Sequence, residues 1–164
     1  LAMYVVRSPS EVPGIAALGP DPLEPGFELR PLLNRKMQAK RLLRDQKIIA
    51  GVGNAYSDEI LHAAKLSPFA IAESLGEDEI IRLEAALHDV LSEAVEEARG
   101  KPAAELKDDK RTRMRVHGRT GEPCPVCGDT VREVSYATSS LQYCATCQTG
   151  GKPLKDRTTS KFLK

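Results

Sequence analysis

The residues of this chain with the clearest chemical potential are its four cysteines, which form two Cys-x-x-Cys pairs. The pairs are Cys124 with Cys127 and Cys144 with Cys147, separated by residues 128–143. Each pair is a tight turn that can direct two sulfurs at one centre, and this spacing is typical of a tetrahedral zinc site on two short β-hairpins. Two disulfides or buried thiols are the alternatives, but no secretory leader precedes the pairs to indicate an oxidising compartment. We predict one structural Zn²⁺ held by the four thiolates.

A glycine-containing turn between two predicted helices is the second candidate site. Residues 47–54 are apolar and end in Gly-Val-Gly-Asn, where Gly53 permits a close or left-handed backbone. We predict Asn54 as the N-cap of the next helix, where free amides and the positive dipole end attract an anion such as phosphate. Lys40 and Arg44 lie one turn apart on the preceding helix and could flank that anion. An ordinary helical hairpin is the alternative, whereas a mononucleotide P-loop is excluded because no Gly-Lys-Ser/Thr follows.

Charge is segregated along the chain although its formal net value is +1. Residues 30–47 carry seven Lys or Arg against a single acid, Asp45, whereas residues 77–97 carry eight acids against a single base, Arg82. From residue 101 onward positive charge again exceeds negative. Segregated positive charge is typical of a protein that binds a polyanion, and solvated helix faces are the alternative. No apolar run is long enough for a membrane span, so we expect no membrane partner.

The elements that position these groups are predicted to be mainly helical. Apolar spacing predicts helices over residues 27–33, 37–46, 55–65 and 77–99. A short strand over residues 3–6 and a basic loop over residues 105–119 complete the assignment outside the cysteine region. The fold class is therefore mainly α with a small β-hairpin zinc ribbon. The predicted organisation is a linker (1–26), a helical domain (27–119), a zinc finger (120–148) and a basic tail (149–164).

Three motifs together resemble the formamidopyrimidine-DNA glycosylase and endonuclease VIII family. They are LGPDPL at 18–23, DQKIIAGVGNAYSDE at 45–59 and the cysteine ribbon that closes with Gln148. The resemblance covers residues 18–148 and implies that the helical domain is a helix-two-turns-helix DNA-binding domain followed by a zinc finger. It also implies a double-stranded DNA partner, contacted at the phosphate backbone around a lesion, by a monomer in the bacterial cytoplasm at the nucleoid.

The resemblance further implies roles for individual residues of the turn. Asn54 matches an asparagine that contacts a phosphate flanking the lesion, and Lys40 matches a lysine that reaches the DNA backbone. Gly53 and Arg44 belong to the same predicted DNA contact.

One position of the finger departs from the family pattern. The family's finger carries an arginine five residues before the third cysteine, where this chain has Ser139. Insertion of the finger into the minor groove is therefore in doubt, with Gln142 or Arg132 as weaker candidates for a DNA contact. We assign no catalytic role to the histidines, because two are expected to be surface or packing residues of helices and the third lies beside a zinc whose ligand set is complete. These histidines are His62, His88 and His117.

Catalysis in the family depends on an N-terminal proline followed by glutamate, both in a β-sandwich domain that precedes LGPDPL. Seventeen residues precede LGPDPL here, and the start of the chain has no Pro-Glu. We therefore expect residues 1–26 to be a remnant of that domain and the chain to bind damaged or abasic DNA without catalysis. Two alternatives stay open: abasic-site lyase activity through another amine such as Lys155, and a protein-interaction module that docks a partner on the acidic helix.

Overall fold

The computed structural model describes residues 3–102 and 112–155 of the 164-residue chain. The α-helices are α1 (Pro13–Ala16), α2 (Ala39–Arg44), α3 (Asn54–Ala63), α4 (Glu77–Ala98) and α6 (Ala145–Thr149). Short 3-10 turns lie at Pro9–Glu11, Arg30–Leu33 and Ala72–Ser74, and the strands are β1 (Val131–Ser135) and β2 (Ser140–Cys144). The predicted fold class, mainly α with a small β-hairpin ribbon, is confirmed. No helix among these residues has the length and apolar content needed to cross a membrane.

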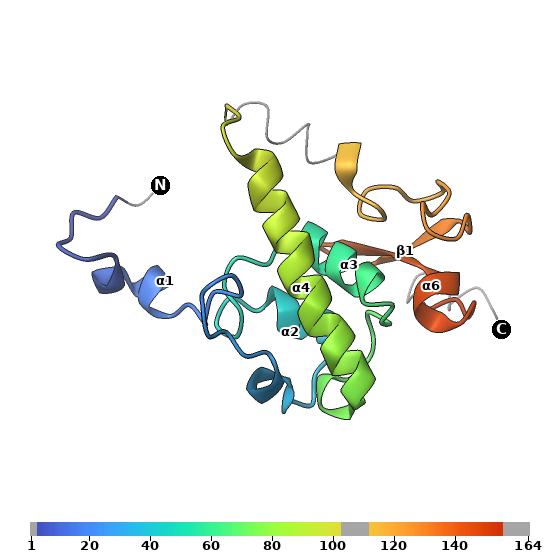
Figure 1. Ribbon diagram of the computed structural model, residues 1–164, viewed down its shortest axis with the longest axis horizontal. Coiled ribbons are helices and arrows are strands. Elements are labelled where there is room, and N and C mark those ends of the chain that lie inside the picture. Colours follow the sequence, from blue (N-terminus) through green and yellow to red (C-terminus); the bar gives the residue numbers. More distant parts are fainter. Residues whose placement is uncertain (1–2, 103–111, 156–164) are drawn as a thin grey trace.

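The long helix α4 packs across α3 and organises the main core (Figure 1). Its buried stripe of Leu83, Leu87 and Leu91 follows the i, i+4 spacing that keeps side chains on one face. Ile60 and Leu61 of α3 belong to the same buried cluster and have no measurable exposure. The carboxylates in the first turn of α4 lie where the helix dipole favours negative charge. Apolar periodicity therefore predicted this helix almost to the residue.

The LGPDPL segment and the glycine turn, far apart in the sequence, are joined by backbone hydrogen bonds. The Gly19 amide donates to the Gln46 carbonyl at 2.8 Å, and the Ala50 amide donates to the Pro20 carbonyl at 3.0 Å. A Cβ on Gly19 would lie 2.5 Å from the carbonyl carbon of Ile48, a distance that no packed side chain adopts. These contacts fix the turn that leads into α3.

The strands β1 and β2 of the zinc-finger region form an antiparallel hairpin, with Val131 opposite Cys144 and Ser135 opposite Ser140. A single antiparallel bridge between Pro123 and Thr130 brackets the first Cys-x-x-Cys turn. The hairpin lies beside α3, and α6 packs at its end (Figure 1). The Gln148 side chain joins the two regions, because its Nε2 donates to the Leu66 carbonyl at 2.9 Å while its Oε1 accepts from the Cys144 amide at 2.9 Å.

Several local predictions differ from the structure. Residues 3–6 form no strand, and the first predicted helix is reduced to the 3-10 turn Arg30–Leu33. The second helix is shorter than predicted because its beginning is engaged elsewhere: Gln38 pairs with Ile71 in a β-bridge, and the Ala39 amide donates to Ala70 at 2.7 Å. A second hairpin was predicted to carry Cys144 and Cys147. In the structure these two cysteines lie instead where β2 leads into α6. Parts of the predicted basic loop and tail, residues 103–111 and 156–164, lie outside the described residues, as do residues 1–2.

Candidate zinc centre and nucleic-acid interface

The four cysteine sulfurs converge on one point between the first knuckle and the end of β2. All four Sγ atoms lie within 4.8 Å of one another. The Sγ atoms of Cys127 and Cys144 are 3.3 Å apart, and those of Cys124 and Cys147 are 3.9 Å apart. Tetrahedral Zn²⁺ with Zn–S bonds of about 2.3 Å places its sulfurs about 3.8 Å apart, so the cluster fits this ion. Four thiolates leave no open coordination position, so the zinc is structural.

Backbone hydrogen bonds shape the turn that carries Cys124 and Cys127. The Gly128 amide donates to the Cys124 carbonyl at 2.9 Å, and Gly128 has a φ of 78°, in the left-handed region that favours glycine. The Cys124 amide donates to the Asp129 carbonyl at 2.7 Å. The second pair is placed by secondary structure, since Cys144 ends β2 and Cys147 lies in the first turn of α6.

His62 of α3 is the nearest partner of the zinc ligands from outside the finger. Its Nε2 lies 3.3 Å from Cys124 Sγ, and the ring is buried. Burial, and secondarily the charge of Arg115, lowers the pKa of His62 to about 4. The ring is therefore neutral at physiological pH and can donate one N–H to the thiolate. Sequence reasoning treated His62 as a surface or packing residue and missed this contact, because nothing local in the sequence links the two positions.

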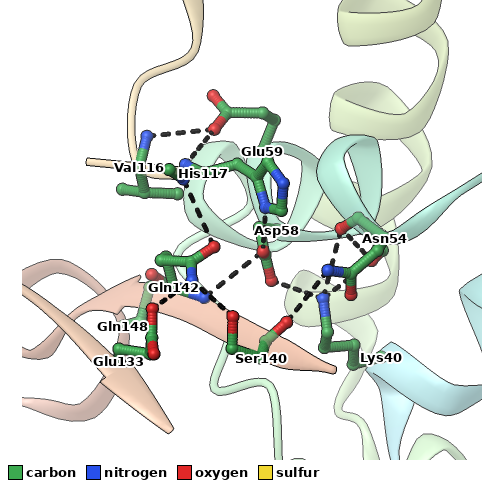
Figure 2. Close-up of polar contacts among 12 residues, drawn as sticks. Lys40, Asn54, Asp58, Glu59, Val116, His117, Glu133, Ser140, Gln142 and Gln148 are labelled. Carbon is green, nitrogen blue, oxygen red and sulfur yellow. Dashed lines mark hydrogen bonds and ion pairs between the residues drawn. The ribbon is translucent and has the colours of Figure 1, made fainter. Parts of the chain in front are cut away.

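Glu59 of α3 fixes the segment that enters the finger (Figure 2). Its buried carboxylate accepts the backbone amides of Arg115 at 2.7 Å, Val116 at 2.9 Å and His117 at 2.8 Å. Three charge-assisted hydrogen bonds compensate the desolvation of this carboxylate. Val116 is thereby held in the small core that also contains two of the zinc ligands.

Asp58, the preceding residue, joins three different parts of the molecule. One oxygen pairs with the Lys40 ammonium of α2, and the other accepts from His117 Nδ1 at 2.7 Å (Figure 2). The second oxygen also accepts the Gln142 amide of β2 at 3.3 Å. The Asp58 side chain is fully buried. The helical domain, the segment that enters the finger (residues 115–117) and the hairpin therefore meet at one carboxylate.

Lys40 is buried within this network and is not an exposed surface cation. Its Nζ donates to the Asn54 carbonyl at 3.3 Å and to Ser57 Oγ at 2.9 Å, in addition to the ion pair with Asp58. Burial lowers the pKa of Lys40, and the Asp58 carboxylate opposes that shift. All three ammonium protons have acceptors inside the protein, so a phosphate contact by Lys40 would require one of them to be exchanged.

The predicted N-cap is one residue too late. Gly53 is the N-cap and Asn54 is the first residue of α3, because Asn54 has already entered the helical backbone conformation. The Asn54 side chain instead braces the finger, since its Nδ2 donates to the Ser140 carbonyl of β2 at 2.9 Å. A carboxamide has two N–H donors, so one remains for another acceptor. No side chain caps α3 at its N-terminus. The first backbone amides of a helix have no acceptor within the helix, so those of α3 lack a side-chain acceptor as well.

A groove runs between α2 and the turn of the finger hairpin. The residues that line it are Gln38, Lys40, Arg41, Arg44, Asp45, Tyr136, Ser139 and Leu141. Two predicted DNA-binding residues, Lys40 and Arg44, thus lie in one wall, and Asn54 lies next to Lys40 at the start of α3. The proposal that Gln142 contacts DNA is wrong, because Gln142 is only 3% exposed and its amide is used by Glu133 and Ser140. Arg132 is exposed on β1.

Comparison with known proteins agrees with this architecture. Residues 18–104 match the formamidopyrimidine-DNA glycosylase H2TH domain, and residues 121–150 match a zinc finger found in FPG and IleRS. The chain belongs to the formamidopyrimidine-DNA glycosylase family. The resemblance inferred from the motifs and the zinc inferred from the cysteine spacing are thereby confirmed.

Two relatives show how the chain compares in length with other members of this family. It is 57% identical over 150 residues to an uncharacterized formamidopyrimidine-DNA glycosylase-like protein of Mycobacterium tuberculosis, covering 90% of this chain and 95% of that protein. It is 43% identical over 154 residues to the formamidopyrimidine-DNA glycosylase of Thermus thermophilus, covering 86% of this chain but 57% of that enzyme. The chain therefore spans little more than half of the Thermus enzyme.

Solved structures give the same relation. The crystal structure of the MutM (Fpg) protein from Thermus thermophilus superposes with a TM-score of 0.76 at 41% identity, over 91% of this chain and 60% of that one. A Lactococcus lactis Fpg in complex with DNA that contains an abasic site superposes with a TM-score of 0.73 at 27% identity, over 85% and 55% of the two chains.

Asp58 and Glu59, like His62, are structural residues that sequence reasoning missed. Both lie inside the DQKIIAGVGNAYSDE motif, so the motif marked them, but all of their partners except Lys40 lie more than fifty positions away. Two adjacent acids on a predicted helix, next to an apolar stripe, were the available signal.

Replacing Glu59 with Gln tests the entry-segment contact. A carboxamide offers an oxygen on one side only, so at least one of the three amides loses its acceptor and faces an NH₂ group. We expect the free energy of unfolding of the zinc-loaded protein to fall by about 1–3 kcal/mol in urea titrations. Hydrogen exchange at residues 115–117 should accelerate. Glu93→Gln is the matched control, since its exposed pair with Arg115 at 3.5 Å should contribute little. Equal effects of the two substitutions would contradict the assignment.

Replacing His62 with Phe tests the contact between α3 and the zinc ligand. Phenylalanine fills the same space but cannot donate to Cys124 Sγ, and loss of a partner around a metal ligand weakens metal affinity by ~10–100-fold. Competition with a chromophoric chelator should show this weakening. The exposed His88 of α4 provides the control substitution, His88→Phe, which should leave zinc affinity unchanged. Unaltered zinc retention in the His62 variant would exclude the role.

Proposed function

We propose that this chain binds double-stranded DNA around a damaged or abasic site, chiefly through the phosphate backbone, and does not cleave it. The observation that carries the proposal is the groove between α2 and the finger, with Arg41 and Arg44 on its helical wall and the start of α3 beside it. The known complex of a Lactococcus lactis Fpg with abasic-site DNA has this architecture and supports the same partner here.

The proposed phosphate contacts are the Arg44 guanidinium and the first amides of α3, at Gly53 and Asn54. An uncapped helix N-terminus presents N–H donors and a positive dipole end to an anion. The Lys40 ammonium donates to the Asn54 carbonyl. It could contact a phosphate only by giving up one of its hydrogen bonds within the protein. All of these groups belong to one chain, so we propose that a monomer occupies each site, at the nucleoid in the bacterial cytoplasm.

The absence of cleavage is proposed from the chemistry of the groove. Among the described residues that line it, Lys40 carries the only amine, and this amine is held in an ion pair with Asp58. A Schiff base needs a free, unprotonated amine next to the abasic aldehyde. An amine outside the groove, such as Lys155, is the alternative source of lyase activity.

The acidic face of α4 gives less support to a protein-docking function. Glu97 pairs with Arg113 at 2.8 Å, Glu93 approaches Arg115 at 3.5 Å, and Glu77 pairs with Arg30. Part of this acidity is therefore neutralised inside the molecule and is not presented to a partner.

Replacing Arg44 with Ala tests the backbone contact. Each phosphate neutralised by a cation contributes about 0.9 to the slope of log affinity against log salt. We expect weaker binding to an abasic duplex at low salt and a slope reduced by about one, measured by fluorescence anisotropy. Arg99→Ala removes an exposed arginine from the end of α4, where it pairs with Glu96 at 2.9 Å, and should change neither quantity. Failure of the unsubstituted protein to bind at low salt would defeat the proposal.

Borohydride trapping tests the absence of cleavage. Reduction of a Schiff base links an enzyme covalently to an abasic strand, so we expect the zinc-loaded chain to form no adduct and to leave the strand intact. A full-length glycosylase of the family serves as the positive control. A covalent adduct that disappears in Lys155→Ala would establish the lyase alternative instead.

A further inference from the structure

We propose that residues 152–155, which follow α6, form a second contact for the backbone of double-stranded DNA through the ammonium groups of Lys152 and Lys155. This inference rests on the proposed DNA-binding function, because it adds phosphate contacts to the same partner. Neither lysine lines the groove between α2 and the finger, so the contact is also separate from the Asp45 carboxylate in that groove.

Two glycines redirect the chain after α6 and set the start of this segment. Gly150 and Gly151 have φ values of 59° and 81°, in the left-handed region that is common at the end of a helix. The Gly151 amide donates to the Ala145 carbonyl at 3.0 Å, which closes the turn. The Lys152 amide donates to the Thr149 carbonyl at 3.2 Å, and the Lys152 carbonyl accepts from the Thr149 hydroxyl. The backbone at Lys152 is therefore held against the end of α6.

Leu154 anchors the segment to the hairpin. Its amide donates to the Tyr143 hydroxyl at 2.8 Å, and Tyr143 is only 1% exposed. The half-buried Leu154 side chain packs against an apolar cluster that includes Val134 and Leu141. Leu141 also lines the groove between α2 and the finger. Residues 152–155 are therefore attached to the hairpin that forms one side of the groove.

The two lysines on either side of this anchor carry free positive charge. Both are exposed, and neither forms an ion pair with another residue of the described ranges 3–102 and 112–155. Lys40 differs, because its ammonium is paired with Asp58 in the interior. The sequence continues with three further cations and one acid, namely Arg157, Lys161, Lys164 and Asp156. The described part of the chain thus leaves the charge of Lys152 and Lys155 available to an anionic partner.

The phosphate backbone of DNA is the partner that this arrangement fits. An ammonium group is a point charge that neutralises a phosphate without reading a base. Hydrogen bonds already order the backbone at Lys152 and Leu154, so binding has fewer bonds of the segment left to immobilise. A duplex is longer than the groove, and its backbone continues past the hairpin that carries these lysines. The second contact therefore extends the first along the same duplex.

Removing both lysines tests the contact in the full zinc-loaded chain. Each phosphate neutralised contributes about 0.9 to the slope of log affinity against log salt, so Lys152→Ala with Lys155→Ala should reduce the slope by about two. Fluorescence anisotropy with an abasic duplex over a salt series measures this slope. The ratio of affinities for abasic and undamaged duplexes should stay the same, because backbone contacts do not distinguish them. Lys152→Arg with Lys155→Arg should retain the slope.

A matched control removes two exposed arginines elsewhere. Arg7→Ala with Arg99→Ala changes the net charge equally, and these residues lie in the N-terminal segment and after α4, away from α6 (Figure 1). We expect the control to bind as the unsubstituted protein does. A loss of slope equal to that of the lysine variant would show an effect of net charge alone and overturn the second contact.

Replacing Tyr143 with Phe tests the anchor. Phenylalanine keeps the ring in the core but offers no acceptor to the Leu154 amide. We expect faster hydrogen exchange at Leu154 and affinity for the abasic duplex roughly threefold weaker at low salt, since binding must then order the segment. Faster exchange with unchanged affinity would exclude a role for the anchor in the contact.

The outcomes separate this proposal from the function on which it rests. If the slope is unchanged without the two lysines while Arg44→Ala still reduces it, the second contact is overturned and DNA binding at the groove stands. If the unsubstituted protein does not bind duplex DNA at low salt, both proposals fall together. Zinc content and circular dichroism of each variant show whether a loss of affinity reflects loss of the fold.

Discussion

The buried carboxylates of Asp58 and Glu59 hold the separate parts of this molecule in register. Burial of two adjacent charges is costly unless each is paired or accepts several hydrogen bonds. Here one carboxylate meets Lys40, His117 and the hairpin, and the other accepts three successive backbone amides. Because these partners come from three separate segments, the carboxylates set the position of the finger relative to the helices.

The finger needs this support because it has little core of its own. Its two buried clusters are small, and one consists of Val116, Val131 and two zinc ligands. A region of this size is stabilised mainly by its metal and by docking onto a larger neighbour. His62 and Gln148 contribute to this docking. His62 of α3 contacts the zinc ligand Cys124, and Gln148 of α6 donates to the Leu66 carbonyl just after α3. Zinc binding and docking therefore stabilise the finger jointly.

The same network shapes the side of the molecule that carries the groove between α2 and the finger. The charge of Lys40 is paired with Asp58 in the interior. The cations that α2 exposes to solvent are Arg41 and Arg44. Asn54 joins α3 to Ser140 and so holds the hairpin turn across the groove from these arginines. This hydrogen bond helps to fix the hairpin relative to the start of α3.

Features that depend on local spacing could be predicted from the amino-acid sequence. The cysteine pairs predicted zinc, and three motifs indicated the family. Apolar periodicity predicted a helix over residues 77–99, and the structure has α4 over Glu77–Ala98. Boundaries were less well predicted where tertiary contacts intervene: a β-bridge at Gln38 shortens α2, and Gly53 takes the N-cap position predicted for Asn54.

Which polar residues are available to a partner, in contrast, depends on the folded molecule. Lys40 and Gln142 looked like exposed DNA contacts in the sequence, but both are buried, and Asp58, Glu59 and His62 had no predicted partner. Hydrogen bonds between segments more than fifty positions apart leave no periodic trace in the sequence. Burial and pairing of charge are properties of the assembled molecule, so they emerge only when α2, α3 and the finger are brought together.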